Sequence, residues 1–269
     1  MTDRVRYHRF ADAPGFVLGD ARLAGRAFGP HYHLDYHIGV LDHGVQAQHF
    51  GGTTHLLAPG AVSFMPPGEV HDGAGSDEGF RLRTFRIAPD FLLPLCSEIA
   101  GRDGVPAQSG VILENPRLAR QLRCLHEALG GQQETVTLAA QSGLIEVFAG
   151  LMEASGEHPG PEPVAGALGD AECRRVHDYC MSRLAERITL EDLAVLCGMS
   201  RFQFLRRFSR RFGLTPHNWL IRLRLERACH LLARGGRTVA ELAQELGFYD
   251  QSHFTRCFRA AFGVAPTRY

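Results

Sequence analysis

Four histidines in the N-terminal third are the residues whose spacing first suggests chemistry. His31, His33 and His37 fall within the stretch HYHLDYH, and His71 closes a later stretch, PPGEVH. Alternate residues of a β-strand point to one face, so the spacing predicts that the three rings of HYHLDYH share a strand face. Neutral imidazoles bind zinc, iron or nickel. The spacing therefore predicts either a divalent metal site or a histidine-lined pocket without an ion.

The histidines lie in a region whose pattern is typical of short strands. Between residues 16 and 88, short apolar runs such as HIGVLDHG and FRLRTFRIAP alternate with Gly, Pro and Asp turns. This spacing predicts a small β-barrel or sandwich. Arg81, Arg83 and Arg86 lie in the last run, where they are candidate partners of an effector carboxylate or, alternatively, outward-facing surface residues.

A helical period follows between residues 89 and 153. The segment PRLARQLRCLHEALG carries one apolar stripe at helical spacing, and TVTLAAQSGLIEVFAGLM predicts a second helix. The two helices either cover the barrel or present an exposed leucine stripe to a second copy of the chain. The leucine stripe consists of Leu118, Leu122, Leu125 and Leu129.

Residues 154–169 are rich in Pro and Gly, which predicts a linker.

The formal net charge of zero conceals a difference between the two halves. Residues 170–269 carry 17 Arg against 10 acidic residues, or +7, whereas residues 1–169 carry 12 Arg against 19, or −7. A basic C-terminal block favours a polyanionic partner such as nucleic acid. The alternative is a solvated basic surface.

The C-terminal block contains an internal repeat, in which residues 193–216 align with residues 242–266. Each copy reads as a helix, a turn with Gly, and a second helix that ends at Gly and Pro. This order predicts two helix-turn-helix motifs. Positions that recur 49 residues later are Leu193, Ala194 and Gly198, and those that recur 50 residues later are Phe204, Phe208, Phe212, Gly213 and Pro216.

The second helix of each motif presents polar and basic side chains opposite its phenylalanines. Such a helix enters the major groove, where Arg pairs with guanine and Gln with adenine. Two copies on a basic block predict DNA binding. The candidate reading residues are Phe202, Gln203, Arg206, Arg207 and Arg210 in the first copy, and Ser252, His253, Thr255 and Arg256 in the second.

Residues 176–269 resemble the AraC/XylS family of bacterial transcription regulators. The resemblance rests on the two repeats and on the segment ELAQELGFYDQSHFTRCFRAAFGVAPTRY. It implies a promoter-binding regulator, usually an activator, with RNA polymerase as a further partner. By position, it adds Gln251 to the reading residues.

The N-terminal half is similar to the cupin barrel that carries the effector in that family. Gly60, Pro66, Gly68 and His71 have the spacing of the second cupin motif. The resemblance implies a small-molecule effector, and helices that pair two chains in a homodimer. The expected effector residues are His31, His33, His37, His71 and Tyr36.

Metal-dependent cupins usually bind the ion with two histidines of an HxH motif, a glutamate and a later histidine. Here His37 stands in the place of the glutamate. Asp35 is the acidic residue whose spacing would place it on the same strand face as the histidines, where it could replace one as a ligand. Two alternatives stay open. A divalent ion binds to His31, His33, His37 and His71, or the chain requires no cofactor.

We therefore expect an α+β protein with an N-terminal cupin-like β-barrel, flanking helices and an all-α domain with two helix-turn-helix motifs. The expected domains are the barrel at 1–90, a helical and dimerisation segment at 91–153, the linker at 154–169 and the DNA-binding domain at 170–269.

The expected function is a DNA-binding transcriptional activator whose promoter binding is controlled by a small effector in the barrel. It is not expected to be an enzyme, and the alternative is a metal-dependent cupin enzyme fused to a DNA-binding domain. The polar N-terminus lacks a signal-peptide core, and no apolar run is long enough to span a membrane. We therefore expect a cytoplasmic protein with no membrane partner.

Overall fold

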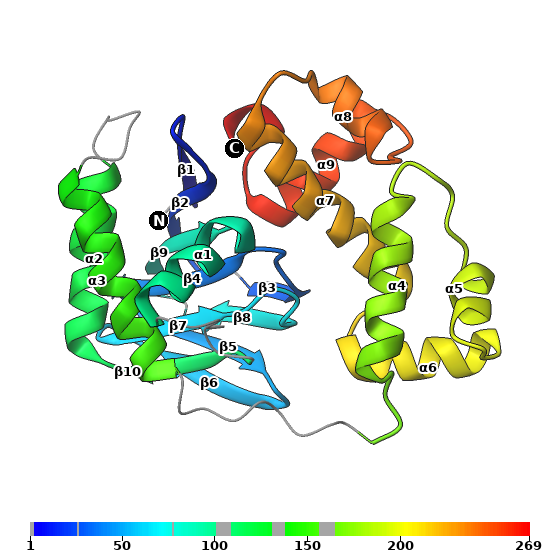
Figure 1. Ribbon diagram of the computed structural model, residues 1–269, viewed down its shortest axis with the longest axis horizontal. Helices are drawn as coiled ribbons and strands as arrows, with labels where there is room; N and C mark the ends of the chain where they lie inside the picture. The colour runs from blue at the N-terminus through cyan, green and yellow to red at the C-terminus, as the bar shows by residue number, and fades with distance from the viewer. Residues whose placement is uncertain (1–2, 26, 77, 101–108, 131–137, 156–164) are drawn as a thin grey trace. The chain divides into compact units, whose positions relative to one another are not determined.

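The computed structural model describes residues 3–25, 27–76, 78–100, 109–130, 138–155 and 165–269. The chain divides into two compact units, residues 1–161 together with residues 268–269, and residues 162–267. The first combines strands and helices and the second is helical, which confirms the expected α+β class (Figure 1). Among the described residues, no helix is both long and apolar enough to cross a membrane.

The strands of the first unit form two antiparallel sheets. The six-stranded sheet has the order β1-β2-β9-β4-β7-β10, and the four-stranded sheet has the order β3-β8-β5-β6. Between β2 and β9 the chain crosses repeatedly from one sheet to the other, as in a closed sandwich or barrel. The strands are β1 (Arg4–Phe10), β2 (Ala13–Leu23), β3 (Ala27–His31), β4 (Tyr36–His43), β5 (Gln46–Phe50), β6 (Thr53–Leu57), β7 (Ala61–Met65), β8 (His71–Gly75), β9 (Phe80–Ile87) and β10 (Val111–Glu114).

The central strands β9, β4 and β7 of the six-stranded sheet are buried on both faces, and the alternation along each strand separates the two faces. On β4, Tyr36, Ile38 and Val40 belong to a large core shared with the helices, whereas Leu41 belongs to a smaller cluster with Leu57 of the other sheet. One face therefore packs under helices, and the opposite face lines the space between the sheets.

Three helices cover the outer face of this sheet: α1 (Pro89–Ala100), α2 (Pro116–Gly130) and α3 (Leu138–Ser155). Figure 1 shows α2 and α3 side by side against the strands. The predicted leucine stripe of α2 is buried in the shared core. The covering interpretation is thus confirmed, and the alternative in which this stripe joins a second chain is wrong. The segment is also not wholly helical, because β10 pairs with β7.

The second unit contains α4 (Asp170–Ser182), α5 (Leu190–Leu196), α6 (Arg201–Phe212), α7 (Pro216–Arg234), α8 (Val239–Glu245) and α9 (Gln251–Phe262), followed by a 3₁₀ turn at Pro266–Arg268. The pairs α5–α6 and α8–α9 are the two predicted helix-turn-helix motifs. Long α7 joins them, and Trp219 on α7 packs against both Phe208 and Phe212. The phenylalanine stripes form the interior of each motif because the helices are otherwise polar.

Candidate effector site and nucleic-acid interface

The stretch HYHLDYH does not form one strand, contrary to the sequence prediction. His31 ends β3 in the four-stranded sheet, residues 32–35 cross to the other sheet, and His37 lies in β4. Alternation along a sequence cannot distinguish one strand from two that face a common interior. The rings nevertheless converge, because the crossing is short and the interior is shared.

Three histidines form a compact cluster in which the ring of His31 lies 4.4 Å from His71 and 5.1 Å from His33, measured between centroids. The potential ligand nitrogens of His31, His33 and His71 all lie within 4.8 Å of one another. His37 is outside this set. Its ring stacks on His33 at 4.5 Å and lies 6.3 Å from His71. The structure therefore brings all four predicted rings together. Only the nitrogens of His31, His33 and His71 lie close enough to bind one ion.

Tyr36 lies away from this cluster, so the prediction that it lines the effector site is wrong. Its ring stacks on Phe64 at 5.8 Å in the core beneath the helices. Burial raises the pKa of the Tyr36 hydroxyl, and Cys96 adds to the shift. The strand alternation explains the error, since neighbouring His37 necessarily points to the opposite face.

Asp35 and Arg86 form a buried ion pair beside the histidines. The Arg86 Nη2 donates to Asp35 Oδ2 at 3.0 Å, and the arginine is only 2% exposed. Arg86 lies opposite His37 in the register of β4 and β9, so both side chains share the interior face. Asp35 is thus committed to a guanidinium. Arg86 is the one arginine of the predicted three that points inward.

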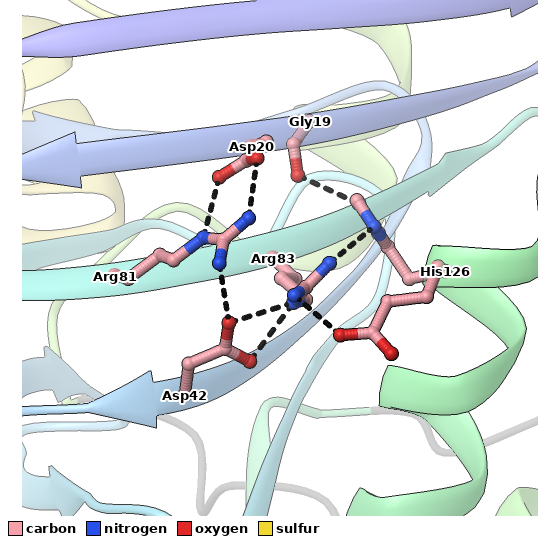
Figure 2. Close-up of polar contacts among 7 residues, drawn as sticks. Gly19, Asp20, Asp42, Arg81, Arg83 and His126 are labelled. Carbon is pink, nitrogen blue, oxygen red and sulfur yellow. Dashed lines mark hydrogen bonds and ion pairs between the residues drawn. The ribbon is translucent and has the colours of Figure 1, made fainter. Parts of the chain in front are cut away.

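Arg81 and Arg83 instead lie on the side of the sheet that α2 covers, which favours the outward-facing alternative over a role as effector partners (Figure 2). Arg81 donates twice to Asp20, at 3.0 and 2.8 Å, and Arg83 pairs with Asp42 at 2.8 Å and with Glu127 of α2 at 2.7 Å. The hydrogen bond from Arg81 lowers the pKa of Asp20. This network links the six-stranded sheet to α2.

Sequence reasoning missed His126, which completes this network from α2. Its Nε2–H donates to the Gly19 carbonyl at 2.9 Å, which leaves Nδ1 to accept from Arg83 at 3.3 Å. Burial, partly offset by the Gly19 hydrogen bond, lowers the pKa of His126 to about 4. The ring is therefore neutral at pH 7. Its position beside buried Leu125 and Leu129 in the amphipathic helix was the available signal.

A row of buried polar side chains crosses the barrel interior between the two sheets. Ser63 Oγ on β7 donates to Gln48 Oε1 at 2.7 Å, and Gln48 Nε2 on β5 donates to Gln46 Oε1 at 2.9 Å. All three are at most 7% exposed. Sequence reasoning missed them because Gln and Ser in a strand usually face solvent.

In the second unit, the exposed faces of α6 and α9 carry the predicted reading residues. Phe202 is 74% exposed, and Arg206, Arg207 and Arg210 are also exposed. On α9, one shallow groove is lined by Gln251, Ser252, Thr255, Arg256, Arg259 and Ala260. The structure thus brings four predicted reading residues of the second copy together with Arg259 and Ala260.

Three predicted reading residues have local contacts of their own. The Ser200 backbone N–H donates to Gln203 Oε1 at 3.1 Å, which makes Gln203 part of a helix cap. The His253 ring packs edge-on against Phe248 at 5.5 Å. A Cβ placed on Gly166 would lie 2.7 Å from Arg210 Nη1, so this guanidinium lies beside the segment that precedes α4.

Comparisons with known proteins give a consistent result over both units. Residues 13–148 match the family described as AraC-like ligand binding domain, and residues 193–269 match a helix-turn-helix domain family. The HTH-type transcriptional activator RhaS of Citrobacter koseri is 28% identical over 255 residues, which cover 93% of this chain and 90% of that protein. YbfI of Bacillus subtilis, an uncharacterized HTH-type transcriptional regulator, is 27% identical over 233 residues, which cover 84% and 81%.

Solved structures of ToxT from Vibrio cholerae share the fold. The 1.65 Å structure has a TM-score of 0.62 at 15% identity and covers 95% of this chain and 97% of that chain. A second structure, of ToxT bound to an unsaturated fatty acid, has a TM-score of 0.61 at 15% identity, with 94% of each chain covered.

Proposed function

The chain belongs to the AraC family of transcriptional regulators, and on this premise we propose that an effector in the barrel interior controls promoter binding by α6 and α9. One observation carries the proposal. The barrel interior buries hydrogen-bonding side chains where an ordinary core would have apolar ones. They include His33, His71, Gln48 and Arg86. A concentration of buried polar groups is typical of a site that recognises a small molecule.

The DNA side of the proposal rests on the exposed faces of α6 and α9. Arg206 and Arg256 occupy corresponding positions 50 residues apart, and both are exposed. We assign them base contacts, since Arg pairs bidentately with guanine in the major groove. Arg259, next to Arg256 on the lining of the α9 groove, is suited to a phosphate.

The mode of regulation is proposed from the relatives. RhaS is named a transcriptional activator, which supports activation and contact with RNA polymerase by this chain. We further propose a homodimer, because two copies would double the DNA contacts at a promoter. A cytoplasmic location follows from a promoter as target. Light scattering of the full chain, free and with promoter DNA, tests the dimer.

The enzyme alternative gains no support from the site. Asp35, which the sequence offered as an acidic ligand, is ion-paired with Arg86 at 3.0 Å. We propose that the barrel senses a ligand and does not catalyse a reaction.

The experiment that tests this function uses the full chain in two steps. Selection from a random DNA library should yield a sequence motif with two half-sites about one helical turn apart. A thermal-shift screen of small molecules and metal ions should then identify ligands that stabilise the wild type but not His71→Gln, and those ligands should change affinity for the selected DNA. Unselective DNA binding, or hits that stabilise both proteins equally, would refute the proposal. His43→Gln, at an exposed position, serves as the matched control.

A further inference from the structure

We propose that His31, His33 and His71 bind one divalent transition-metal ion, and that this ion is the effector of the regulator. The assignment of the ion as effector rests on the function proposed above, whereas the metal site stands on its own geometry. The three potential ligand nitrogens lie within 4.8 Å of one another. Ring rotation alone brings such nitrogens toward the roughly 3.4 Å separation of ligands around tetrahedral zinc, given Zn–N bonds of about 2.0–2.1 Å.

The backbone holds the three ligands in place. His31 and His71 are directly opposed residues of β3 and β8, so their rings start from adjacent positions. His33 lies in the crossing between the sheets, where its carbonyl accepts a 2.8 Å hydrogen bond from the Gly68 N–H. Gly68 precedes His71 by three residues. The crossing and the turn before β8 are thereby joined, and a site built on fixed backbone needs little rearrangement to bind.

Two of the rings are held in the tautomer that a metal requires. His31 Nδ1 lies 2.8 Å from the Gly29 carbonyl, and His71 Nδ1 lies 3.0 Å from the Glu69 carbonyl. A carbonyl oxygen can only accept, so each Nδ1 carries the proton and the lone pair is on Nε2. Metal-binding histidines are commonly oriented in this manner, with the second ring nitrogen donating to a carbonyl or carboxylate.

The donor set selects the class of ion. Three neutral nitrogens suit zinc, cobalt, nickel or copper, whereas calcium and magnesium prefer oxygen ligands. Asp35 does not alter this choice because it pairs with Arg86. His37 stacks on the His33 ring at an interplanar angle of 16° and fixes its plane. We assign His37 a positioning role.

Metal binding at these residues would add a second link between the crossing and the four-stranded sheet, beside the hydrogen bond from the Gly68 N–H to the His33 carbonyl. His31 ends β3 and His71 begins β8, both in the four-stranded sheet, while His33 belongs to the crossing that enters β4 of the six-stranded sheet. The same crossing carries Asp35, which contacts Arg86 on β9. An ion would therefore stabilise one arrangement of the two sheets, which is the differential binding that a regulatory ligand requires.

The test begins with full-length protein made without a histidine tag and treated with chelator. Titration with Co²⁺ should give the visible absorption of a nitrogen-ligated site and saturate at one ion per chain. Zn²⁺ should then displace the cobalt. His33→Gln and His71→Gln should each weaken Zn²⁺ binding by at least about 100-fold, because even loss of an outer partner weakens binding 10- to 100-fold. His43→Gln should bind like the wild type.

Several outcomes overturn the metal site: no bound ion in the wild type, a thiolate charge-transfer band, or unchanged Zn²⁺ affinity in His33→Gln and His71→Gln. A thiolate band would point to a cysteine such as exposed Cys124, and Cys124→Ser identifies it. The wild-type stoichiometry and cobalt spectrum decide the matter even where a variant fails to fold.

The effector assignment is tested separately with the selected DNA. Zn²⁺ should change the DNA affinity of the wild type by about 5- to 150-fold, the usual range of allosteric coupling. It should leave the DNA affinity of His71→Gln unchanged. An ion that binds without altering DNA affinity overturns the effector assignment and leaves the metal site. Absence of selective DNA binding with and without Zn²⁺ instead refutes the proposed function.

Discussion

The two helix-turn-helix motifs share their buried side and differ at their turns and exposed faces. Phe204 and Phe254, at corresponding positions, are both fully buried, whereas the exposed Phe202 of α6 corresponds to the exposed Ser252 of α9. Each second helix ends at a glycine with positive φ. The difference shows that the repeat preserves what is needed to fold, while the exposed faces of α6 and α9 vary between the copies.

The turns differ because the second copy has one more residue. The Phe248 N–H donates to the Ala243 carbonyl, as the Met199 N–H donates to the Ala194 carbonyl in the first copy. The Phe248 ring packs on Phe254 at 5.0 Å. The additional residue, Tyr249, is 92% exposed. Buried Arg224 of α7 donates to the Gly247 carbonyl at 2.7 Å and thereby ties this turn to the connecting helix.

Truncation of the buried phenylalanines should have the largest effect and should be equal in the two copies. Phe204→Ala and Phe254→Ala should each lower the free energy of unfolding of the second unit by about 3–5 kcal/mol, through lost burial and a residual cavity. Fluorescence of Trp219, the single tryptophan of the chain, monitors this unit during urea denaturation.

Phe202→Ala and Tyr249→Ala are the matched controls because both side chains are exposed. Each should change stability by no more than about 0.5 kcal/mol. A cost for Phe204→Ala that is far below that of Phe254→Ala would show that the two motifs are not equivalent in packing.

The turn glycines should distinguish the copies. Gly198 and Gly247 both have positive φ, at 65° and 70°, so alanine is strained at either position. Around Gly198 a Cβ meets nothing within 4 Å, whereas at Gly247 it would clash with the Leu184 carbonyl and lie 2.7 Å from Arg224 Nη2. We expect Gly198→Ala to cost about 1 kcal/mol and Gly247→Ala about 2–4 kcal/mol. Equal costs in the same urea assay would contradict a more constrained second turn.

The exposed faces should separate the copies by sequence preference. Arg206→Ala and Arg256→Ala should each weaken binding to the selected DNA by about 1–3 kcal/mol and relax the preference at one base pair, in different half-sites. Arg183→Ala, at the end of α4, is the control. Repeated selection with each variant locates the affected base pair. A loss that is the same for every DNA sequence would mark a phosphate contact instead.

The helical unit was predictable from sequence because its information is local. Caps, turn glycines and phenylalanines at helical spacing recur between the copies, and the structure confirms both motifs. By contrast, β1 was missed, since RVRYHRF is a largely polar strand at the sheet edge. Four-residue β10 was missed as well, because a short strand is identified by its partner β7 and not by its own pattern.

The candidate effector site was only partly predictable for the same reason. The convergence of His31, His33, His37 and His71 was predicted, although on the wrong number of strands. Which side of the sheet each residue faces depends on pairing between distant segments, and one step along a strand reverses it. Tyr36 was therefore assigned to the interior in error.

The smallest expected effect concerns the caps of the first helices, and it should again be equal in the two copies. Thr189 accepts from the Asp192 N–H and Thr238 accepts from the Glu241 N–H, each at 3.2 Å. Thr189→Ala and Thr238→Ala should each cost about 1 kcal/mol at pH 7.

Acid should diminish both penalties. Hydrogen bonds from Thr189 lower the pKa of Asp192, and those from Thr238 lower the pKa of Glu241. A carboxyl whose pKa is lowered in the folded state stabilises it above the unfolded pKa, and the contribution is lost as pH falls through the folded value. Both penalties should therefore begin to shrink as pH falls below about 4, through loss of the hydrogen bonds from the threonine hydroxyls to the carboxylates. Urea denaturation at pH 7 and at pH 3.5 measures this, and a penalty that persists in acid for only one copy would show that its cap does not depend on the carboxylate.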